Sequence, residues 1–291
     1  MKSTPAEGLS AAPNPADLVR NLEHLPATAA VLPHLLRLLK SDSAALSEVI
    51  ELIRVDSAIT ARTLQMGSSA YYNPRGTPCE SVADAVHRVG FNEVYKLVSY
   101  AATAQLLMRA LAPYALQPED TWKRSVSCAL AAEQLADHAG VNRNLAYTAG
   151  LLHGVGMIAI DAWMQKEGRE LYFDSDELPL EATASEARLI GCTNAEVGSA
   201  LLQLWEFPSA IVEPVRWQYE PARSRTEPTL ACLLHVAKWL RDAAHLPEEQ
   251  PLPTAPADWI LQTLQLTSAD LEIRLYQVRD AFLAAARLLD N

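Results

Sequence analysis

The chain has 291 residues, of which 49% are hydrophobic, and it carries a formal net charge of −11 with a pI of about 5.1. This length and composition can fill one large core or two modest ones. The acidic balance and the lack of a lysine- and arginine-rich run oppose nucleic-acid binding, because phosphate contacts supply most non-specific affinity.

The cysteines and the apolar segments indicate in which cellular compartment the protein is expected. Four cysteines are widely spaced and form no C-x-x-C pair, which suits neither a zinc cluster nor a disulfide framework. The first residues lack the apolar core of a signal peptide. We find no run approaching the roughly 18–20 apolar residues of a membrane helix. We therefore expect a cytoplasmic protein with no membrane association.

In the first half, apolar residues recur at helical spacing and no segment alternates as a strand would. Residues 1–13 are rich in Ala, Ser and Pro and are predicted to be a mobile tail. The sequence predicts a helix that ends at Gly90, followed directly by a long helix that ends at about Leu111. The residues suited to cap the helices of this half are Asn14, Thr28, Asp56, Ser81 and Asn92.

The second half begins after a break at residues 112–118, where Pro113 and Pro118 interrupt the chain. A helix over Glu119–Ala139 is predicted to follow, ended by Gly140. Thr193 and Glu196 have the spacing of a capping box. Further helices are predicted over Ser209–Tyr219, Thr229–His245, Asp258–Leu266 and Ser268–Leu289, with loops at Ala222–Pro228 and Leu246–Pro256.

The break at 112–118 is the best boundary between two helical groups. The sequence predicts a tail at 1–13, an N-terminal helical lobe at 14–112, a second helical lobe at 118–245 and a C-terminal extension at 257–291. Residues 14–245 are read as one unit. The fold class is all-α.

The last predicted helix carries an apolar stripe at 4-3-4-3-4 spacing, which is a heptad seam. It consists of Leu271, Leu275, Val278, Phe282, Ala285 and Leu289. The seam suits a coiled-coil contact or packing back onto the main bundle, and we favour the second.

Eight separate stretches, in this order and spacing, form a recognisable pattern. They are Ile53–Arg62, Ser68–Tyr72, Ser81–Gly90, Trp122–Ser125, Ala149–Gly154, Ala195–Gly198, Leu204–Pro208 and Leu234–Lys238. Together they resemble the bacterial HDOD family, catalytically degenerate relatives of the HD metal-dependent phosphohydrolases. The resemblance covers roughly residues 22–245 and implies a two-lobed helical fold, with an N-terminal lobe joined to an HD-like lobe.

The resemblance also indicates where an HD hydrolase would hold its metal. The first histidine falls at Arg124, and the His-Asp pair reads His153-Gly154. A further histidine is replaced by Asn194, the next pair reads Gln218-Tyr219, and the final aspartate falls at Lys238. A catalytic zinc site needs about three protein ligands, and two of these replacements are cations. The resemblance thus implies no metal, no cofactor and no catalytic residue.

Two interpretations of the former metal site stay open. Arg124, His153, Asn194, Gln218 and Lys238 could form an anion pocket for a nucleotide or cyclic dinucleotide phosphate. Alternatively, both long cationic side chains turn outward to water. For His153, the alternative to a ligand role is a core histidine with one ring nitrogen bonded to a carbonyl.

A possible partner surface lies in the first lobe. Tyr71, Tyr72 and Arg75 are residue types common in protein interfaces. The alternative is that one tyrosine fills the core and the other is merely exposed.

The leading functional hypothesis is a non-catalytic, cytoplasmic signalling protein of bacterial type that acts as an adaptor or output module through protein contacts. A partner bound between the two lobes would favour one relative orientation of them. The alternatives are a nucleotide or cyclic-dinucleotide sensor and a divergent HD-type phosphohydrolase or phosphodiesterase.

Overall fold

The computed structural model describes residues 13–20, 50–51, 53–54, 57–69, 72–73, 76–77, 79, 81–173, 182–247 and 249–289. Across these residues the protein is helical and has no strand, and its ladder pairing is limited to one isolated bridge between Leu111 and Leu116. The predicted all-α class is confirmed. The predicted tail, apart from Pro13, and the predicted caps Thr28 and Asp56 lie outside the described residues.

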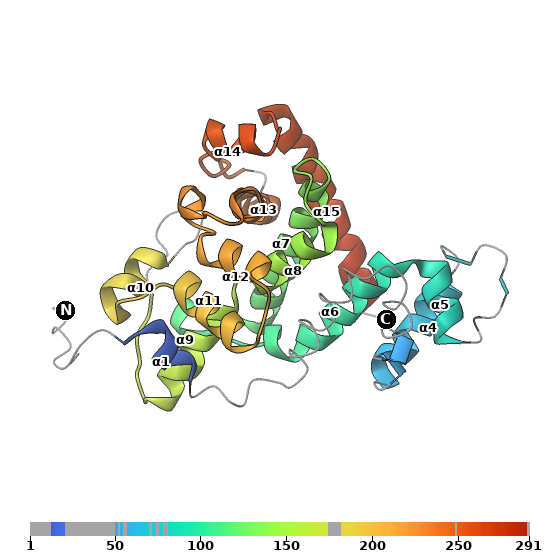
Figure 1. The fold of residues 1–291 in the computed structure, drawn as a ribbon, viewed down its shortest axis with the longest axis horizontal. Helices are drawn as coiled ribbons and strands as arrows, with labels where there is room; N and C mark the ends of the chain where they lie inside the picture. Colours follow the sequence, from blue (N-terminus) through green and yellow to red (C-terminus); the bar gives the residue numbers. More distant parts are fainter. Residues whose placement is uncertain are drawn as a thin grey trace.

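A small lobe is formed by α4 (Ser57–Ser68), α5 (Val82–Val89) and α6 (Phe91–Leu107), which pack on one another (Figure 1). As predicted, Ser81 caps α5, with its hydroxyl accepting from the Asp84 backbone N–H at 3.1 Å, and α5 ends at Gly90 with φ at 89°. The predicted cap at Asn92 is wrong. The helix α6 already begins at Phe91, and Asn92 instead accepts a hydrogen bond from Asn144 at 2.9 Å.

The helix α6 ends earlier than the predicted residue, Leu111. The helix stops at Leu107 because the chain folds into a tight loop, in which Leu111 pairs with Leu116 around the 3₁₀ turn η2 (Ala112–Tyr114). The predicted break at 112–118 is therefore an ordered turn. It ends where Pro118 opens the next helix.

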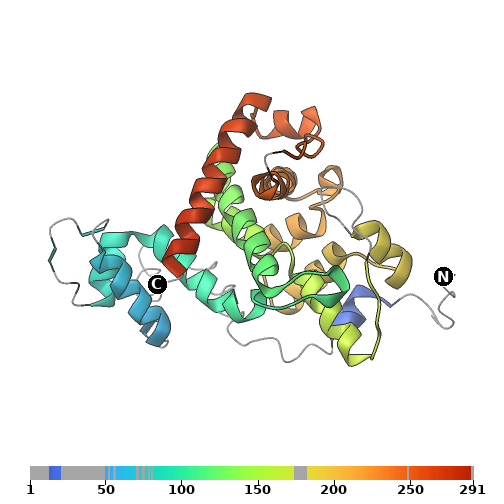
Figure 2. The same ribbon diagram turned by 180° about the vertical axis from the view of Figure 1, so that it is seen from behind.

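The larger lobe contains seven α-helices and one 3₁₀ turn among the described residues. The helix α7 packs along α8 and α13, α9 packs against α11, and α12 lies between α11 and α13 (Figures 1 and 2). The Thr193–Glu196 capping box is present at the start of α11. These elements are α7 (Pro118–Ala136), α8 (Arg143–Leu152), α9 (Val155–Lys166), α10 (Thr183–Ile190), α11 (Asn194–Leu204), α12 (Ser209–Arg216), η3 (Pro221–Arg223) and α13 (Pro228–His245).

The helix α12 ends at Arg216, three residues before the predicted Tyr219. The side-chain amide of Gln218 donates to the Val215 carbonyl at 3.0 Å. In a continuing helix that carbonyl would accept from the backbone N–H of Tyr219. The early end frees Gln218 and Tyr219 to point into the bundle.

The two lobes meet along α6, which packs on α7 and α8. The buried Tyr95 hydroxyl hydrogen-bonds the Thr148 hydroxyl at 2.7 Å, and Lys96 lies 3.2 Å from the Glu133 carboxylate. The short helix α1 (Pro15–Val19) packs on α9 and α11 of the larger lobe, although the predicted lobe 14–112 includes it. The domain boundaries otherwise stay a prediction.

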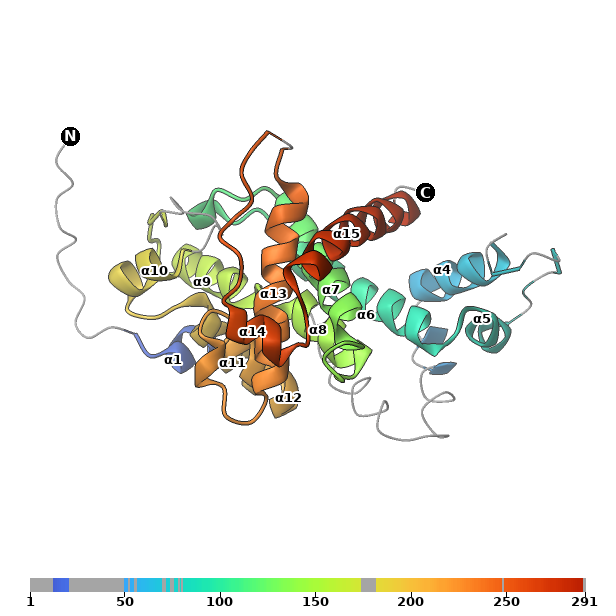
Figure 3. The same cartoon turned by 90° about the horizontal axis from the view of Figure 1, so that it is seen from above.

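The C-terminal helices are α14 (Asp258–Thr263) and α15 (Ser268–Leu289). The seam of α15 packs on α7 and α13, which confirms the favoured interpretation. Leu271, Leu275 and Val278 are buried, and the Phe282 ring lies 5.4 Å from that of Trp122. Figure 3 shows α15 crossing the larger lobe and pointing toward α4 and α5.

One stretch corrects our expectation about membrane helices. Arg143–Lys166 is long and apolar enough to cross a membrane by length and composition, and 83% of its most apolar window is buried. It consists of α8 and α9, which form the centre of the larger lobe. Burial of this kind is what a core helix of a bundle requires.

Close packing of α9 on α11 depends on Gly156. A Cβ placed there would overlap the Asn194 carbonyl oxygen and come within 2.7 Å of the Gly198 nitrogen. Both are backbone atoms, so relief requires the helices to separate. The close approach of α9 to α11 therefore requires glycine at this position.

We expect Gly156→Ala to lower the free energy of unfolding by about 1–3 kcal/mol, because the added methyl overpacks a helix contact. Gly154→Ala is the matched control. At Gly154 φ is −95°, and an added Cβ would meet only the mobile end of Met157, at 3.1 Å. Urea unfolding of both variants measures the difference, and an equal loss in the two would contradict the packing role.

Candidate functional site

The histidine singled out in the sequence lies at the junction of two buried helices. His153 follows the last residue of α8, and Gly154 precedes the first residue of α9. The side chain is enclosed in the larger lobe, with 2% of the residue exposed. Because His153 lies where α8 ends and α9 has not yet begun, its ring points toward α13.

Both ring nitrogens of His153 are engaged. Nδ1 lies 2.6 Å from the Gly150 carbonyl oxygen, and Nε2 lies 2.6 Å from Nη1 of Arg241. A carbonyl only accepts and a guanidinium only donates, so Nδ1 carries the proton and Nε2 accepts. Burial, followed by the charges of Arg241 and Lys238, holds the pKa of His153 well below its usual value. The ring is neutral and has no lone pair left for a metal.

Arg241 is held by its neighbour in the sequence. Its Nε and Nη2 donate to the two carboxylate oxygens of Asp242 at 2.8 and 2.6 Å. Burial opposes charge on Arg241, but attraction to Asp242 and the hydrogen bonds outweigh it and raise the Arg241 pKa. Burial likewise would raise the pKa of Asp242, but Arg241 and then Arg124 bring it below its usual value. The pair is therefore ionised.

Arg124, on α7, is the second cation at this carboxylate. Its Nη1 lies 3.5 Å from Oδ1 of Asp242, and 16% of its side chain is exposed. Burial, and then repulsion by Arg241, lower the pKa of Arg124 to about 10. One carboxylate thus faces two guanidinium groups.

Lys238 lies one turn before Asp242 on α13 and is 2% exposed. Its ammonium lies 3.2 Å from the centre of the Tyr219 ring, a cation–π contact. The hydroxyl of the same tyrosine donates to Oδ1 of Asn194 at 3.0 Å. The residue at the expected aspartate position is therefore a cation resting on an aromatic ring.

Asn194 connects this contact to a buried acid. The Asn194 backbone N–H donates to Oε2 of Glu186 at 2.7 Å, and its side-chain amide lies 3.0 Å from both carboxylate oxygens. The hydroxyl of Tyr114 donates to Oε1 of Glu186 at 2.7 Å. Burial raises the pKa of Glu186, and the hydrogen bonds from Asn194 and Tyr114 partly oppose that rise. A continuous polar path therefore runs from α13 to the turn η2.

Gln218 fastens α12 to the histidine junction. Its side-chain NH₂ donates to the His153 carbonyl at 2.9 Å, and the backbone carbonyl oxygen of Gln218 lies 3.0 Å from Nδ1 of His235. Oε1 of Gln218 and Nε of Arg124 are buried without a hydrogen-bond partner among the described residues. Among the described residues, each of these two side chains thus keeps a buried polar atom without a hydrogen bond.

The structure brings together the five residues predicted at the former metal site. With Glu186, Arg241 and Asp242 they form a set that we call the buried polar cluster. The alternative in which Arg124 and Lys238 turn outward is wrong, because both lie inward. The alternative of a core histidine bonded to a carbonyl is confirmed. Whether the cluster admits a phosphate stays a prediction.

The sequence analysis did not identify three members of the cluster, which are Glu186, Arg241 and Asp242. Lys238, Arg241 and Asp242 follow one another at spacings of three and one in an otherwise apolar helix, so they share a face. That pattern could have indicated Arg241 and Asp242. Glu186 carried no signal, because its partners Asn194 and Tyr114 lie outside its own helix and no local pattern links them to it.

The residues present do not fit a metal ion of the HD type. Among the described residues, no group of three or more His, Cys, Asp or Glu side chains could hold one. The cluster instead sets three cationic side chains against two carboxylates. At roughly 4 Å and an effective dielectric of about 20, a unit charge repels a divalent ion by about 8 kcal/mol.

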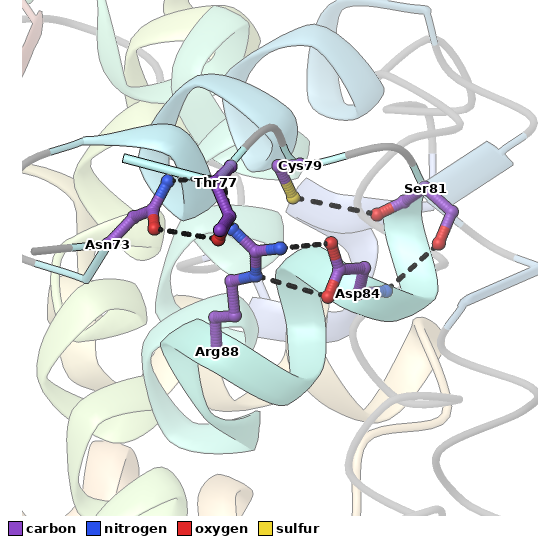
Figure 4. Close-up of polar contacts among 6 residues, drawn as sticks. All are labelled: Asn73, Thr77, Cys79, Ser81, Asp84 and Arg88. Carbon is purple, nitrogen blue, oxygen red and sulfur yellow. Dashed lines mark hydrogen bonds and ion pairs between the residues drawn. The ribbon is translucent and has the colours of Figure 1, made fainter. Parts of the chain in front are cut away.

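The predicted partner surface is described only in part. Tyr71 and Arg75 lie outside the described residues, and Tyr72 is half-buried and packs against the core. The adjoining loop is held to α5, as Figure 4 shows. Arg88 donates to the Asp84 carboxylate at 2.7 and 3.1 Å and to the Thr77 carbonyl at 2.8 Å. The partner role of this surface stays a prediction.

Comparison with known proteins places the chain in a family. The sequence pattern of the HDOD domain matches residues 25–221, and so ends before α13. No curated protein matches the chain.

Several solved structures share the fold. An HDOD domain protein of unknown function from Geobacter sulfurreducens has a TM-score of 0.65 at 21% identity, covering 92% of this chain and 96% of that one. A candidate signal transduction protein from Marinobacter aquaeolei VT8 has a TM-score of 0.67 at 21% identity, covering 92% of this chain and 59% of that one. A candidate phosphohydrolase from Shewanella amazonensis SB2B has a TM-score of 0.64 at 23% identity, covering 94% and 97%.

We expect Asp242→Asn to lower the free energy of unfolding by about 3–5 kcal/mol, because it leaves buried cations without their carboxylate. The double variant Arg241→Met/Asp242→Asn should lose less than the sum of its two single variants, since the first change removes the charge that the second leaves unpaired. Urea unfolding of the four proteins measures this coupling.

Asp137→Asn is the control for this cycle. Asp137 lies 3.7 Å from Arg143 in an exposed pair, and breaking it should cost less than about 1 kcal/mol. Additive losses in the Arg241 and Asp242 cycle would contradict the account of the pair.

Proposed function

The chain belongs to the HDOD domain family, and we propose that it is a non-catalytic signalling protein that acts through contacts with other proteins. The observation that carries this proposal is the arrangement around His153. Its Nε2, the atom that a metal would need, accepts a hydrogen bond from a fully buried arginine. Hydrolysis by a metal-activated water requires the opposite arrangement, with open coordination positions and anionic ligands.

The relatives' names point two ways. One neighbour is named as a candidate signal transduction protein and another as a candidate phosphohydrolase. In this chain the donor set disfavours the second, because lysine and arginine occupy two of the positions where an HD hydrolase has ligands. A signalling role requires only a stable fold and a recognition surface, which places no demand on those positions.

A route for signalling exists in the polar path. Tyr114 belongs to the turn between α6 and α7, and its hydroxyl ends the path from Lys238 through Tyr219, Asn194 and Glu186. A partner that changes the orientation of the small lobe would also act on α6, which is bonded to α8 by Tyr95 and Thr148. We infer that such a change is transmitted through this turn to the centre of the larger lobe.

A nucleotide or cyclic-dinucleotide sensor is the second candidate, favoured by one observation. The buried polar atoms of Arg124 and Gln218 lack partners among the described residues, and a phosphate could satisfy the guanidinium. Entry would require the Arg241–His153 or Lys238–Tyr219 contact to open. Calorimetry with a nucleotide panel, repeated on Arg124→Ala, distinguishes a sensor from an adaptor.

We expect the purified protein to retain no stoichiometric transition metal and to hydrolyse no phosphodiester above background. Gly154→Asp should behave in the same way, although it restores a His-Asp pair, because Arg241 still occupies Nε2 of His153. Aspartate is a favourable residue at the start of a helix, so this variant should fold.

Elemental analysis and hydrolysis of bis-p-nitrophenyl phosphate with added Mn²⁺ or Zn²⁺ provide the measurement. Bound metal together with hydrolysis that is lost in His153→Gln would overturn the non-catalytic proposal. Hydrolysis that persists in His153→Gln would instead indicate a contaminating enzyme, and a control variant at the exposed His87 should keep any hydrolysis that the protein itself carries out.

A further inference from the structure

A surface hollow of about 500 Å³ lies at the end of α12, outside the buried polar cluster. This volume is within the range of small-ligand sites. Its walls come from the last turn of α12 and from the loop around η3. They are formed by Glu213, Arg216, Trp217, Ala222, Arg223 and Arg225, and we call it the arginine–tryptophan hollow.

Two arginines of the hollow stack on one aromatic ring. The guanidinium carbons of Arg216 and Arg223 lie 5.1 and 4.3 Å from the centre of the Trp217 ring. Stacking fixes the plane of a guanidinium while its N–H edge still points to solvent. The two groups are thus oriented in advance for bonds to a planar anion.

The contacts that the arginines of the hollow already make leave guanidinium N–H groups available for a ligand. Arg223 uses Nη1 on the Glu220 carboxylate at 2.7 Å, in a pair with both side chains more than half exposed. Such pairs contribute little and exchange readily. Among the described residues, no ion pair or hydrogen bond engages the guanidinium of Arg216 or Arg225. Glu213, the acid of the hollow, accepts from the Arg225 backbone N–H at 3.2 Å.

The charge of the hollow contrasts with that of the chain. Three arginines gather here in a protein whose formal net charge is −11. An acidic ligand is repelled by most of the molecule and attracted at this place, so charge favours binding at the hollow over binding elsewhere on the surface.

We propose that the arginine–tryptophan hollow docks an acidic peptide segment of a protein partner. Aspartate or glutamate carboxylates of the segment bind the N–H edges of Arg216 and Arg223, and Arg225 adds a third cation at the rim. A nucleobase is a poorer occupant, because it would compete with both guanidinium groups for the Trp217 ring. The inference rests on the proposed function in taking a protein as the source of the carboxylates.

The test uses the full chain and a defined probe. A short fluorescein-labelled peptide of alternating glutamate and alanine is titrated at low salt, alongside the peptide with glutamine in place of every glutamate. We expect saturable binding of the acidic peptide, measured by fluorescence anisotropy, and none of its neutral counterpart. The double variant Arg216→Gln/Arg223→Gln should weaken binding about tenfold or more, since two charge-assisted contacts are lost.

Arg169→Gln is the matched control, because Arg169 lies over Trp163 at 4.9 Å and no second arginine among the described residues contacts that ring. It should leave binding unchanged. Thermal unfolding of each variant confirms that the fold is kept, as expected for substitutions of exposed side chains. Addition of ATP as a competitor distinguishes a nucleotide site from a peptide site.

Three outcomes would overturn the inference: no saturable binding of the acidic peptide, equal binding of the neutral one, or equal binding by the double variant. Binding of ATP measured by calorimetry and lost in the double variant, with no specific binding of the peptide, would assign the hollow to nucleotides instead. None of these outcomes bears on whether the protein is a hydrolase. Metal-dependent hydrolysis would remove the proposed function without changing the peptide result, so the two failures are distinguishable.

Discussion

The hydrogen bond from Arg241 to Nε2 of His153, 2.6 Å long, determines the state of the ring at the centre of the larger lobe. Because a guanidinium can only donate, the imidazole must accept at Nε2 and donate at Nδ1 to Gly150. The bond also requires Arg241 to be buried, and a buried arginine requires a carboxylate, which Asp242 supplies. The neutral histidine, its occupied Nε2 and the buried ion pair follow from this one contact.

Keeping several charges inside a helical bundle costs desolvation, and apolar residues of the same volume would often be at least as stable. What the cluster provides is a set of directional contacts between elements. Gln218 fixes the end of α12 to the α8–α9 junction, and Asn194 fixes the start of α11 to Glu186 on α10. Tyr114 joins the turn before α7 to the same carboxylate. We infer that the polar cluster specifies how the helices are arranged, and that this arrangement supports the recognition surfaces.

Much of the fold could be predicted from local signals. Ser81, Gly90 and the Thr193–Glu196 capping box act within a few residues, and the structure has them where the sequence placed them. The seam of α15 was readable because helical spacing alone determines which residues share a face. Predictions failed where a distant partner decides the outcome. Asn92 pairs across the lobes with Asn144, and α12 ends early because Gln218 takes the carbonyl that would continue it. The resemblance located the five site residues, but not Glu186, whose partners lie in other elements, at the start of α11 and in the turn η2.

The protonation of His153 is the most direct test of this account. In protein labelled with ¹⁵N at histidine, long-range ¹H–¹⁵N correlation spectra distinguish the two neutral tautomers from the imidazolium, and His153→Gln identifies the signals of His153. Burial and the neighbouring cations hold the pKa of this ring well below its usual value. We therefore expect the Nδ1–H tautomer to persist from about pH 8 to pH 5, where an unperturbed histidine with a pKa of about 6.5 becomes protonated. The same spectra should be unchanged by added Zn²⁺. A ring that titrates in this range, or a zinc-induced shift at Nε2, would contradict the account.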